Sequence, residues 1–286
     1  MKELVKAVEE VRKERVKGAS WAMRRLAEAV ISDAESGRIT CNDAQRVGSS
    51  IINANRVMGS LWNLASFIAK GCSSGKTIEW GARMLLWYSS HCRELMAANL
   101  AGVLDPGSTV FTLSYSSAVE LVLSLNQDRI PRVYVSMSYP GGEGIEFAKS
   151  LRRMGFNVIL LHDSDMYRGI RESKIVLIGA DSVSLQEECV FNKLGSLQAS
   201  IIARFVNRRA AVVFESYKIH PELRCDGGGL EVREERISGW GSVFYSLFDQ
   251  VPFKLLDVGL TEAGIIGLDK KHLENAHNNL LSIIED

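Results

Sequence analysis

Lys174-Ile-Val-Leu-Ile-Gly-Ala-Asp181 is the stretch that decides the fold, because an apolar run typical of a buried strand ends there on a carboxylate. A second apolar run, Ala210-Ala-Val-Val-Phe214, ends on Glu215-Ser-Tyr-Lys218, and between them Asn192-Lys-Leu-Gly195 opens a helical segment. Open α/β sheets hold their ligands at the carboxyl ends of parallel strands. The stretch therefore predicts polar side chains gathered at such an edge.

Short apolar runs alternate with helix-like segments through the second half of the chain. The runs are Thr109–Leu113, Val133–Met137, Asn157–Leu161, Ile175–Gly179 and Ala211–Phe214. They are apolar throughout, as strands covered on both faces are. Strands alternating with helices indicate parallel pairing. The fold class predicted is α/β, with an N-terminal helical bundle followed by a Rossmann-like domain whose sheet is mainly parallel.

The first hundred residues carry helical periodicity instead. We expect helices near the N-terminus, over Ala19–Ala34, from about Asp43 to Lys70 (capped by Thr40 or Asn42) and over Thr77–Leu100. Asp105-Pro-Gly-Ser108 is a strong turn signal, and it separates the helical pattern before it from the alternating strands and helices after it. We therefore predict two domains, a helical domain at 1–104 and a Rossmann-like α/β domain at 105–286.

Composition narrows the class of protein. Of the 286 residues, 46% are hydrophobic and 24% charged, and 34 basic residues balance 34 acidic ones. This balance argues against a direct nucleic-acid binder, and no apolar run is long enough for a membrane span. The five cysteines are scattered without a Cys-x-x-Cys pair. We therefore expect no zinc site, no other metal or cofactor, no disulfide framework, and a cytoplasmic location.

The strand ends carry the candidate chemistry. They present Ser114-Tyr-Ser-Ser117, Ser138-Tyr-Pro-Gly-Gly-Glu-Gly144, His162-Asp163, Asp181 and Glu215. The glycines at 141–144 open a helix, where they form either a phosphate-binding turn or a plain tight turn. Gly71-Cys-Ser-Ser-Gly-Lys-Thr77 joins two helices and lacks the spacing of a nucleotide-binding loop. His91 and His162 are interpreted as structural.

Several of these motifs together resemble the family that joins the alpha, beta and delta subunits of translation initiation factor 2B with two sugar-phosphate isomerases. The isomerases act on ribose 1,5-bisphosphate and on methylthioribose 1-phosphate. The resemblance covers nearly the whole chain. Its motifs are Lys17-Gly-Ala19 (Arg-Gly-Ala in the family), Gly179-Ala-Asp181, Asn192-Lys-x-Gly195, Glu215-Ser-x-Lys218 and Thr261-Glu-x-Gly264.

Departures from the isomerase pattern bear on function. Where the isomerases have Thr-His-Cys, with a cysteine that works with the aspartate, this chain has Thr112-Leu-Ser114. A thiol can move a proton near neutral pH, whereas an isolated serine hydroxyl is too weak an acid. Where the isomerases have Glu-x-Arg-Pro, the chain has Met137-Ser-Tyr-Pro140. A phosphate-binding arginine is absent there, and Lys17 replaces another with a point charge.

The resemblance implies a regulatory or scaffold subunit similar to those of initiation factor 2B, without catalysis. The alternative is an aldose–ketose isomerase that uses Asp181 and Ser114 as catalytic residues. The predicted ligand-binding residues are Lys17, Gly18, Ala19, Asp181, Asn192 and Lys193. The ligand would be a sugar phosphate or a nucleoside monophosphate. The expected partners are a second copy of the chain, as a homodimer or higher oligomer, with translation initiation factor 2 as a further candidate.

Overall fold

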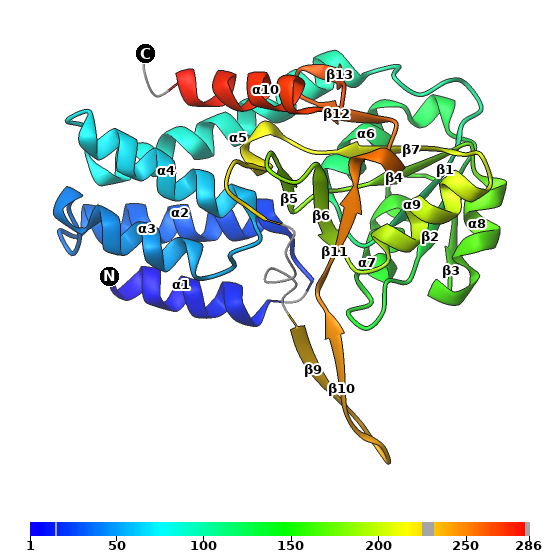
Figure 1. The fold of residues 1–286 in the computed structure, drawn as a ribbon, viewed down its shortest axis with the longest axis horizontal. Coiled ribbons are helices and arrows are strands. Elements are labelled where there is room, and N and C mark those ends of the chain that lie inside the picture. Colours follow the sequence, from blue (N-terminus) through cyan, green and yellow to red (C-terminus); the bar gives the residue numbers. More distant parts are fainter. Residues whose placement is uncertain (15, 225–231, 284–286) are drawn as a thin grey trace.

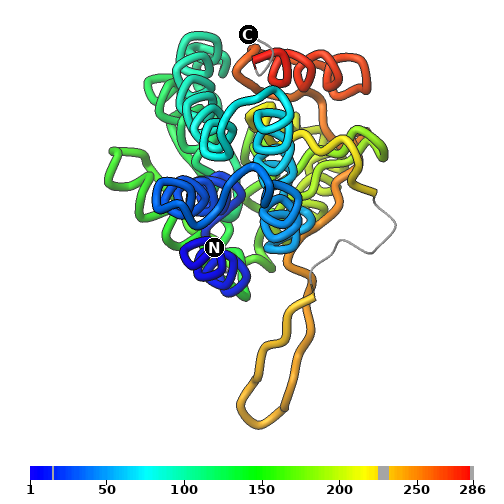
Figure 2. The backbone as a smooth tube through the Cα atoms, turned by 90° about the vertical axis from the view of Figure 1, so that its left-hand side faces the viewer, coloured from blue at the N-terminus to red at the C-terminus, as the bar shows by residue number. Residues whose placement is uncertain are grey.

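A helical part lies beside a sheet that has helices on both faces (Figure 1). The computed structural model describes residues 1–14, 16–224 and 232–283. The helical part consists of α1 (Lys2–Lys13), α2 (Ala19–Glu35), α3 (Ala44–Ile52), α4 (Gly59–Ser73) and α5 (Ile78–Leu100). Figure 2 shows these helices end on, packed side by side. The predicted helices at 19–34 and 77–100 match α2 and α5 closely.

The single helix predicted from about Asp43 to Lys70 is wrong. The chain forms α3 and α4 instead, with a short 3-10 turn (Cys41–Asp43) before α3. Thr40 is the N-cap of this turn in a capping box with Asp43, in which the backbone N–H of Thr40 donates to Asp43 Oδ2 at 2.9 Å. The break between α3 and α4 brings Gly59 against the backbone of Lys218, where a Cβ atom would lie 2.1 Å from the Lys218 carbonyl oxygen. Tertiary contact therefore overrides the continuous helical pattern.

The central sheet has the strand order β13-β12-β7-β4-β1-β2-β3. Its strands are parallel except β13, which runs antiparallel to β12. They are β1 (Thr109–Leu113), β2 (Arg132–Ser136), β3 (Val158–Leu161), β4 (Ile175–Ile178), β7 (Arg209–Val213), β12 (Val258–Thr261) and β13 (Gly264–Ile266). The five predicted strands are all present within a residue or two.

Alternate residues of these strands enter two separate apolar layers. Phe111, Val176 and Val212 pack on the side of α8 (Met166–Glu172) and α9 (Ser196–Phe205). Val110 and Leu177 pack on the other side, against α6 (Ser117–Leu125), α7 (Glu143–Arg153) and the end of α5. Burial on both faces explains why the strands are apolar throughout rather than alternating.

A second sheet was not predicted. Its order is β11-β6-β5-β8, formed by β5 (Ser182–Ser184), β6 (Cys189–Lys193), β8 (Ile219–His220) and β11 (Phe248–Pro252). The strands are short and join segments far apart in sequence, so no local pattern marks them. A separate hairpin of β9 (Val232–Ile237) and β10 (Gly241–Ser246) projects from the body (Figures 1 and 2).

The predicted fold class is confirmed, since a helical part precedes a mainly parallel sheet covered by helices. The domain boundary at 104/105 falls in the loop between α5 and β1 and stays a prediction. The helical core also includes Phe191, Tyr217 and Phe248 from the second half of the chain. None of the helices in the described ranges is long and apolar enough to cross a membrane.

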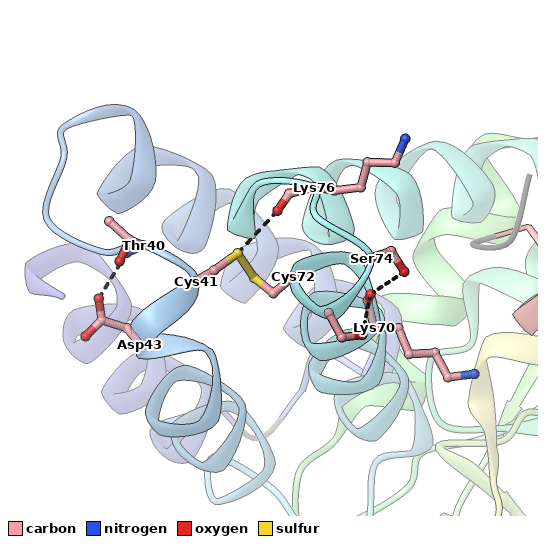
Figure 3. The surroundings of a disulfide bond; sticks show 8 residues. Thr40, Cys41, Asp43, Lys70, Cys72, Ser74 and Lys76 are labelled. Atoms are coloured by element: carbon pink, nitrogen blue, oxygen red, sulfur yellow. Dashed lines mark hydrogen bonds between the residues drawn. A yellow bond between two sulfur atoms is a disulfide. The ribbon is translucent and has the colours of Figure 1, made fainter.

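Cys41 and Cys72 form a disulfide with Cα atoms 5.4 Å apart (Figure 3). Cys189 is also disulfide-bonded. The expectation of no disulfide was therefore wrong. It rested on the scattered positions of the cysteines and the lack of a Cys-x-x-Cys pair. Cys41 and Cys72 are 31 residues apart but meet because α3 and α4 pack together. The cytoplasmic location stays a prediction.

Asn63 on α4 joins three distant segments. Its side-chain amide donates to the carbonyl oxygens of Tyr217 and Ile219 at 2.9 and 2.8 Å. Its oxygen lies 3.0 Å from Nε2 of His277 on α10 (Lys270–Ser282), so that nitrogen donates. The Trp62 ring lies close to both imidazoles, with its centroid 5.6 Å from that of His220 and 6.0 Å from that of His277. Burial lowers the pKa of each imidazole to about 4. The neighbouring His277 lowers the pKa of His220 further, and Lys70 lowers the pKa of His277 further.

We expect acid to destabilise the protein through these two histidines. Their pKa values are lower in the folded chain than the ordinary 6.5, so stability present above pH 6.5 is lost as the pH falls towards 4, by about 2–3 kcal/mol for each imidazole. His277→Gln should remove part of this dependence in urea unfolding between pH 7 and 4. The matched control is His162→Gln on the exposed surface, and equal pH slopes for the two variants would contradict the prediction.

We also expect the Cys41–Cys72 bond to stabilise the folded state. Closing a loop of 31 residues corresponds to about 3–4 kcal/mol in the chain-entropy account. A Cys41→Ser, Cys72→Ser double variant should lose about this much unfolding free energy under oxidising conditions. Reductant should remove the difference between the two proteins. A difference that persists in reductant would assign the effect to packing instead.

Candidate functional site

A cavity of about 300 Å³ opens at the carboxyl ends of β1 and β4. From β1 the strand order runs to β2 on one side and to β4 on the other. Ligand crevices form at such a reversal because the connections leave in opposite directions. The volume lies at the lower end of the range of small-molecule sites.

All of the predicted site residues line this one cavity. They come from the loop before α2, the ends of β1 and β4, and strand β6: Lys17, Gly18, Ala19, Ser114, Asp181, Asn192 and Lys193. Sequence reasoning did not select several further lining residues: Glu14, Trp21, Asn55, Tyr115, Glu146, Lys218, Leu247 and Phe248. Lys218 carried a signal, since it closes the Glu215-Ser-x-Lys motif. The role of the predicted site residues in ligand binding stays a prediction.

Asp181 lies where three elements meet. Its Oδ1 accepts a hydrogen bond from the backbone N–H of Ala19 at 3.0 Å, at the start of α2. Its own carbonyl accepts from Gly59 N at 3.2 Å, at the start of α4. Burial raises the pKa of the Asp181 carboxyl above its ordinary value, and Lys218, the Ala19 N–H and Lys193 offset only part of this. The group is thus a buried carboxyl that can hold a proton at higher pH than an exposed one.

Ser114 follows β1 with a positive φ of 58°, and Ser138 follows β2 with a φ of 61°. The Ser114 N–H donates to Ser138 Oγ at 2.7 Å, and this bond links the end of β1 to the end of β2. The Ser114 hydroxyl lies 3.4 Å from Oε1 of Glu143. Lys193 Nζ lies 2.9 Å from that same oxygen. The serine hydroxyl is therefore directed at a carboxylate that already has a lysine partner.

Lys218 and Glu215 form a second buried ion pair, with Nζ and Oε2 2.9 Å apart and side chains only 5% and 2% exposed. Burial alone would raise the pKa of the Glu215 carboxyl, but the Lys218 ammonium and hydrogen bonds outweigh it and hold the pKa below its ordinary value. Lys218 lines the cavity, whereas Glu215 lies behind it. Two of the lining lysines are therefore charge-balanced by glutamates outside the cavity wall.

The other predicted residues have more local roles. Lys17 Nζ lies 4.6 Å from the centre of the Trp21 ring, a favourable cation–π contact. Asn192 donates to Ser196 Oγ at 2.8 Å. Asp249, opposite Asn192 in the β6–β11 pair, accepts from Gly195 N at 2.7 Å and so holds the start of α9. These contacts position the wall formed by β6.

Some polar strand ends do not reach the cavity. Asp163 accepts hydrogen bonds from the backbone of Ser138 and Tyr139 and so shapes the loop after β2. His162 is not among the lining residues. At the glycine turn, the carboxylate of Glu143 lies against Gly141, where a Cβ would be 2.1 Å from Glu143 Oε2, and a negative charge there disfavours a bound phosphate. The plain-turn alternative fits this geometry better.

No cysteine in the described part of the chain lines the cavity. Cys92 is the free one there, and it is buried in α5. Burial and the nearby carboxylates Glu262 and Glu215 raise the pKa of its thiol. Within the described residues, no cluster of histidine, cysteine and acidic side chains is suited to hold a metal ion.

Residues 2–267 match the Initiation factor 2 subunit family. The chain belongs to this family. A Pyrococcus abyssi protein, provisionally named translation initiation factor eIF-2B subunit 2-like, is 30% identical over 92% of this chain and 96% of its own. Ribose 1,5-bisphosphate isomerase of Archaeoglobus fulgidus is 27% identical over 93% and 90% of the two chains. The family resemblance seen in the motifs is thereby confirmed.

Solved structures agree. The Pyrococcus horikoshii translation initiation factor eIF-2B superposes with a TM-score of 0.85 at 26% identity, over 95% of this chain and 99% of that one. A chain of the tetrameric eIF2B-beta2-delta2 complex from C. thermophilum gives a TM-score of 0.70 at 18% identity, over 97% and 94%. At that identity the likeness extends to the fold alone.

Removing one partner of the buried Lys218–Glu215 pair should strongly destabilise the protein. Lys218→Met leaves a buried carboxylate without its cation, which costs about 3–5 kcal/mol. A Lys218→Met, Glu215→Gln double variant should recover much of this loss in urea unfolding. Lys270→Met, in an exposed pair with Glu274, is the control and should change little. A double variant as unstable as Lys218→Met would contradict the account.

Proposed function

We propose that this chain is a regulatory or scaffold protein of the initiation factor 2B type, without isomerase activity, whose cavity binds a small phosphorylated ligand. The observation that carries the proposal is the environment of Asp181. This buried carboxyl has a raised pKa, as a proton-transfer group would. The second proton-transfer group that an isomerase needs, however, could only be the hydroxyl of Ser114, which is a weak acid.

Aldose–ketose conversion needs one group to remove a proton from carbon and another to deliver one to oxygen. The Ser114 hydroxyl faces Glu143, whose carboxylate is already paired with Lys193 at 2.9 Å. The contact between the serine hydroxyl and this oxygen is long for an O–H···O hydrogen bond at 3.4 Å, and Lys193 already contacts the same oxygen. Proton transfer at neutral pH is therefore unfavourable, which supports binding without turnover.

The charges around the cavity favour a ligand with a single phosphate. The basic residues in the wall are Lys17, Lys193 and Lys218, and none of the described lining residues is an arginine. Lys193 and Lys218 already balance buried glutamates, and Glu14 and Glu146 add negative charge. One phosphate monoester carries about −1.5 to −2 charges at neutral pH, so a bisphosphate would double a charge that this wall neutralises poorly.

The binding claim can be tested by thermal shift. Ribose 5-phosphate or AMP at saturating concentration should raise the melting temperature, since a ligand at 100 times its Kd adds about 2.7 kcal/mol. Lys17→Ala and Asn192→Ala should remove the shift, and Lys271→Ala on the exposed face of α10 should keep it. Ribose 1,5-bisphosphate should give a smaller shift. If neither monophosphate has an effect, or if Lys17→Ala retains it, the ligand proposal fails.

The isomerase alternative is favoured by the raised pKa of Asp181 and by isomerases among the relatives. Incubation with ribose 1,5-bisphosphate and with methylthioribose 1-phosphate, followed for ketose formation, separates the two functions. We expect no turnover. If ketose forms and the Asp181→Asn variant abolishes this activity, the protein is an isomerase and the regulatory proposal is wrong. Asparagine keeps an acceptor for Ala19 N, so this variant should still fold.

Self-association and binding to translation initiation factor 2 complete the proposal, with a cytoplasmic location. The eIF2B tetramer with the same fold supports the first of these. A pulldown with translation initiation factor 2 at micromolar concentration tests the second, and recovery of nothing would count against it.

A further inference from the structure

Glu143 is a buried carboxylate that lies directly behind the cavity wall. It is the first residue of α7 and follows Gly142, whose φ is 72°. Its side chain is 0% exposed, and among the described residues its Oε2 has no hydrogen-bond partner. A buried carboxylate is costly unless it is paired and hydrogen-bonded. The groups around Glu143 therefore indicate what this part of the protein is built to hold.

Three features that attract anions meet at this carboxylate. Lys193 Nζ lies 2.9 Å from Oε1, and the Ser114 hydroxyl lies 3.4 Å from the same oxygen. The third feature is the N-terminus of α7, where the helix dipole and the N–H groups of the first turn favour negative charge. An ammonium, a hydroxyl and a helix N-terminus together form an anion site, and the chain's own carboxylate fills it.

The backbone keeps Glu143 at this place. A Cβ atom on Gly144 would overlap the carbonyl oxygen of Ser136, so the first turn of α7 is pressed against the end of β2. Lys193 and Ser114 both line the cavity, whereas Glu143 is not among the lining residues. The anion site is therefore next to the cavity, and Glu143 occupies it from the protein side.

We propose that Glu143 determines the charge of the ligand, because its carboxylate fills this anion site and so excludes a second phosphate group from the cavity. The inference rests on the proposed function, a cavity for a monophosphate, and names the residue that sets this limit. Glu143 is a positioning residue, since it acts by holding and neutralising the ammonium of Lys193. Lys17, from the loop before α2, contacts the Trp21 ring and holds the single phosphate.

Calorimetric titration of ribose 5-phosphate and of ribose 1,5-bisphosphate into the full chain tests the inference. The wild type should bind the monophosphate more tightly. Glu143→Gln should raise the affinity for the bisphosphate about tenfold, or about 1.4 kcal/mol, because the charge of Lys193 then acts on the second phosphate. The affinity for the monophosphate should change less than about threefold. Glutamine has nearly the shape of glutamate and keeps an acceptor for Lys193, so the variant should fold.

Two further variants separate the charge of Glu143 from its packing and from its distance to the cavity. Glu143→Asp keeps the charge and should keep the wild-type preference even if its melting temperature falls. Glu146→Gln removes a carboxylate one turn along α7, which is 56% exposed and paired with Lys149 at 2.7 Å. It should raise the affinity for the bisphosphate less than about threefold, because exposed charges are screened. An equal gain in Glu146→Gln and Glu143→Gln, or a loss of the preference in Glu143→Asp, would overturn the inference.

A double variant tests the route through Lys193. Adding Lys193→Met to Glu143→Gln leaves no unpaired charge behind the wall, and it should return the preference between the two ligands to that of the wild type. A gain for the bisphosphate that survives in the double variant would refute the positioning role.

The titrations also separate this inference from the proposed function. If the wild type binds ribose 5-phosphate and Glu143→Gln gains no affinity for the bisphosphate, only the role of Glu143 is wrong. If neither the wild type nor any variant binds either phosphate, the ligand proposal and the role of Glu143 are both wrong.

Discussion

The contacts of Asp181 hold the two parts of the molecule in register. Its carboxylate accepts from the first residue of α2, its carbonyl accepts from the first residue of α4, and its own N–H donates to Phe191 in β6. The starts of both helices have N–H groups without partners in the helix, so one residue at the end of β4 satisfies donors from the bundle. The cavity exists because this junction closes one side of the strand ends.

The same junction limits the chemistry. The lysines that enter the cavity beside Asp181 come from β6 and from the turn before β8, and each is paired with a buried glutamate behind the wall. A buried cation with its own counter-ion has little charge left for a highly charged ligand. The isomerases among the relatives share the fold, but fold alone does not determine chemistry. In this chain the cavity wall contains a serine at the end of β1 and two lysines that are paired with buried glutamates.

The second sheet connects features that look unrelated along the chain. Strand β6 carries Asn192 and Lys193, and strand β11 beside it follows directly from the β9–β10 hairpin. Asp249 in β11 holds the start of α9 through Gly195. The predicted ligand-binding residues of β6 and the start of α9 therefore meet at the β6–β11 ladder.

The sequence by itself determined the parallel strands and the polar residues at their ends, because burial on both faces leaves a continuous apolar signature and a clear stop. Asp181 could be predicted for the same reason, whereas Asn192 and Lys193 were selected through the family motif that they carry. Only the tertiary structure decided the break between α3 and α4, the Cys41–Cys72 bond, the second sheet and the pairing of Lys193 with Glu143. Each of these depends on contacts between residues distant along the chain, and such contacts leave no periodic trace in either segment alone.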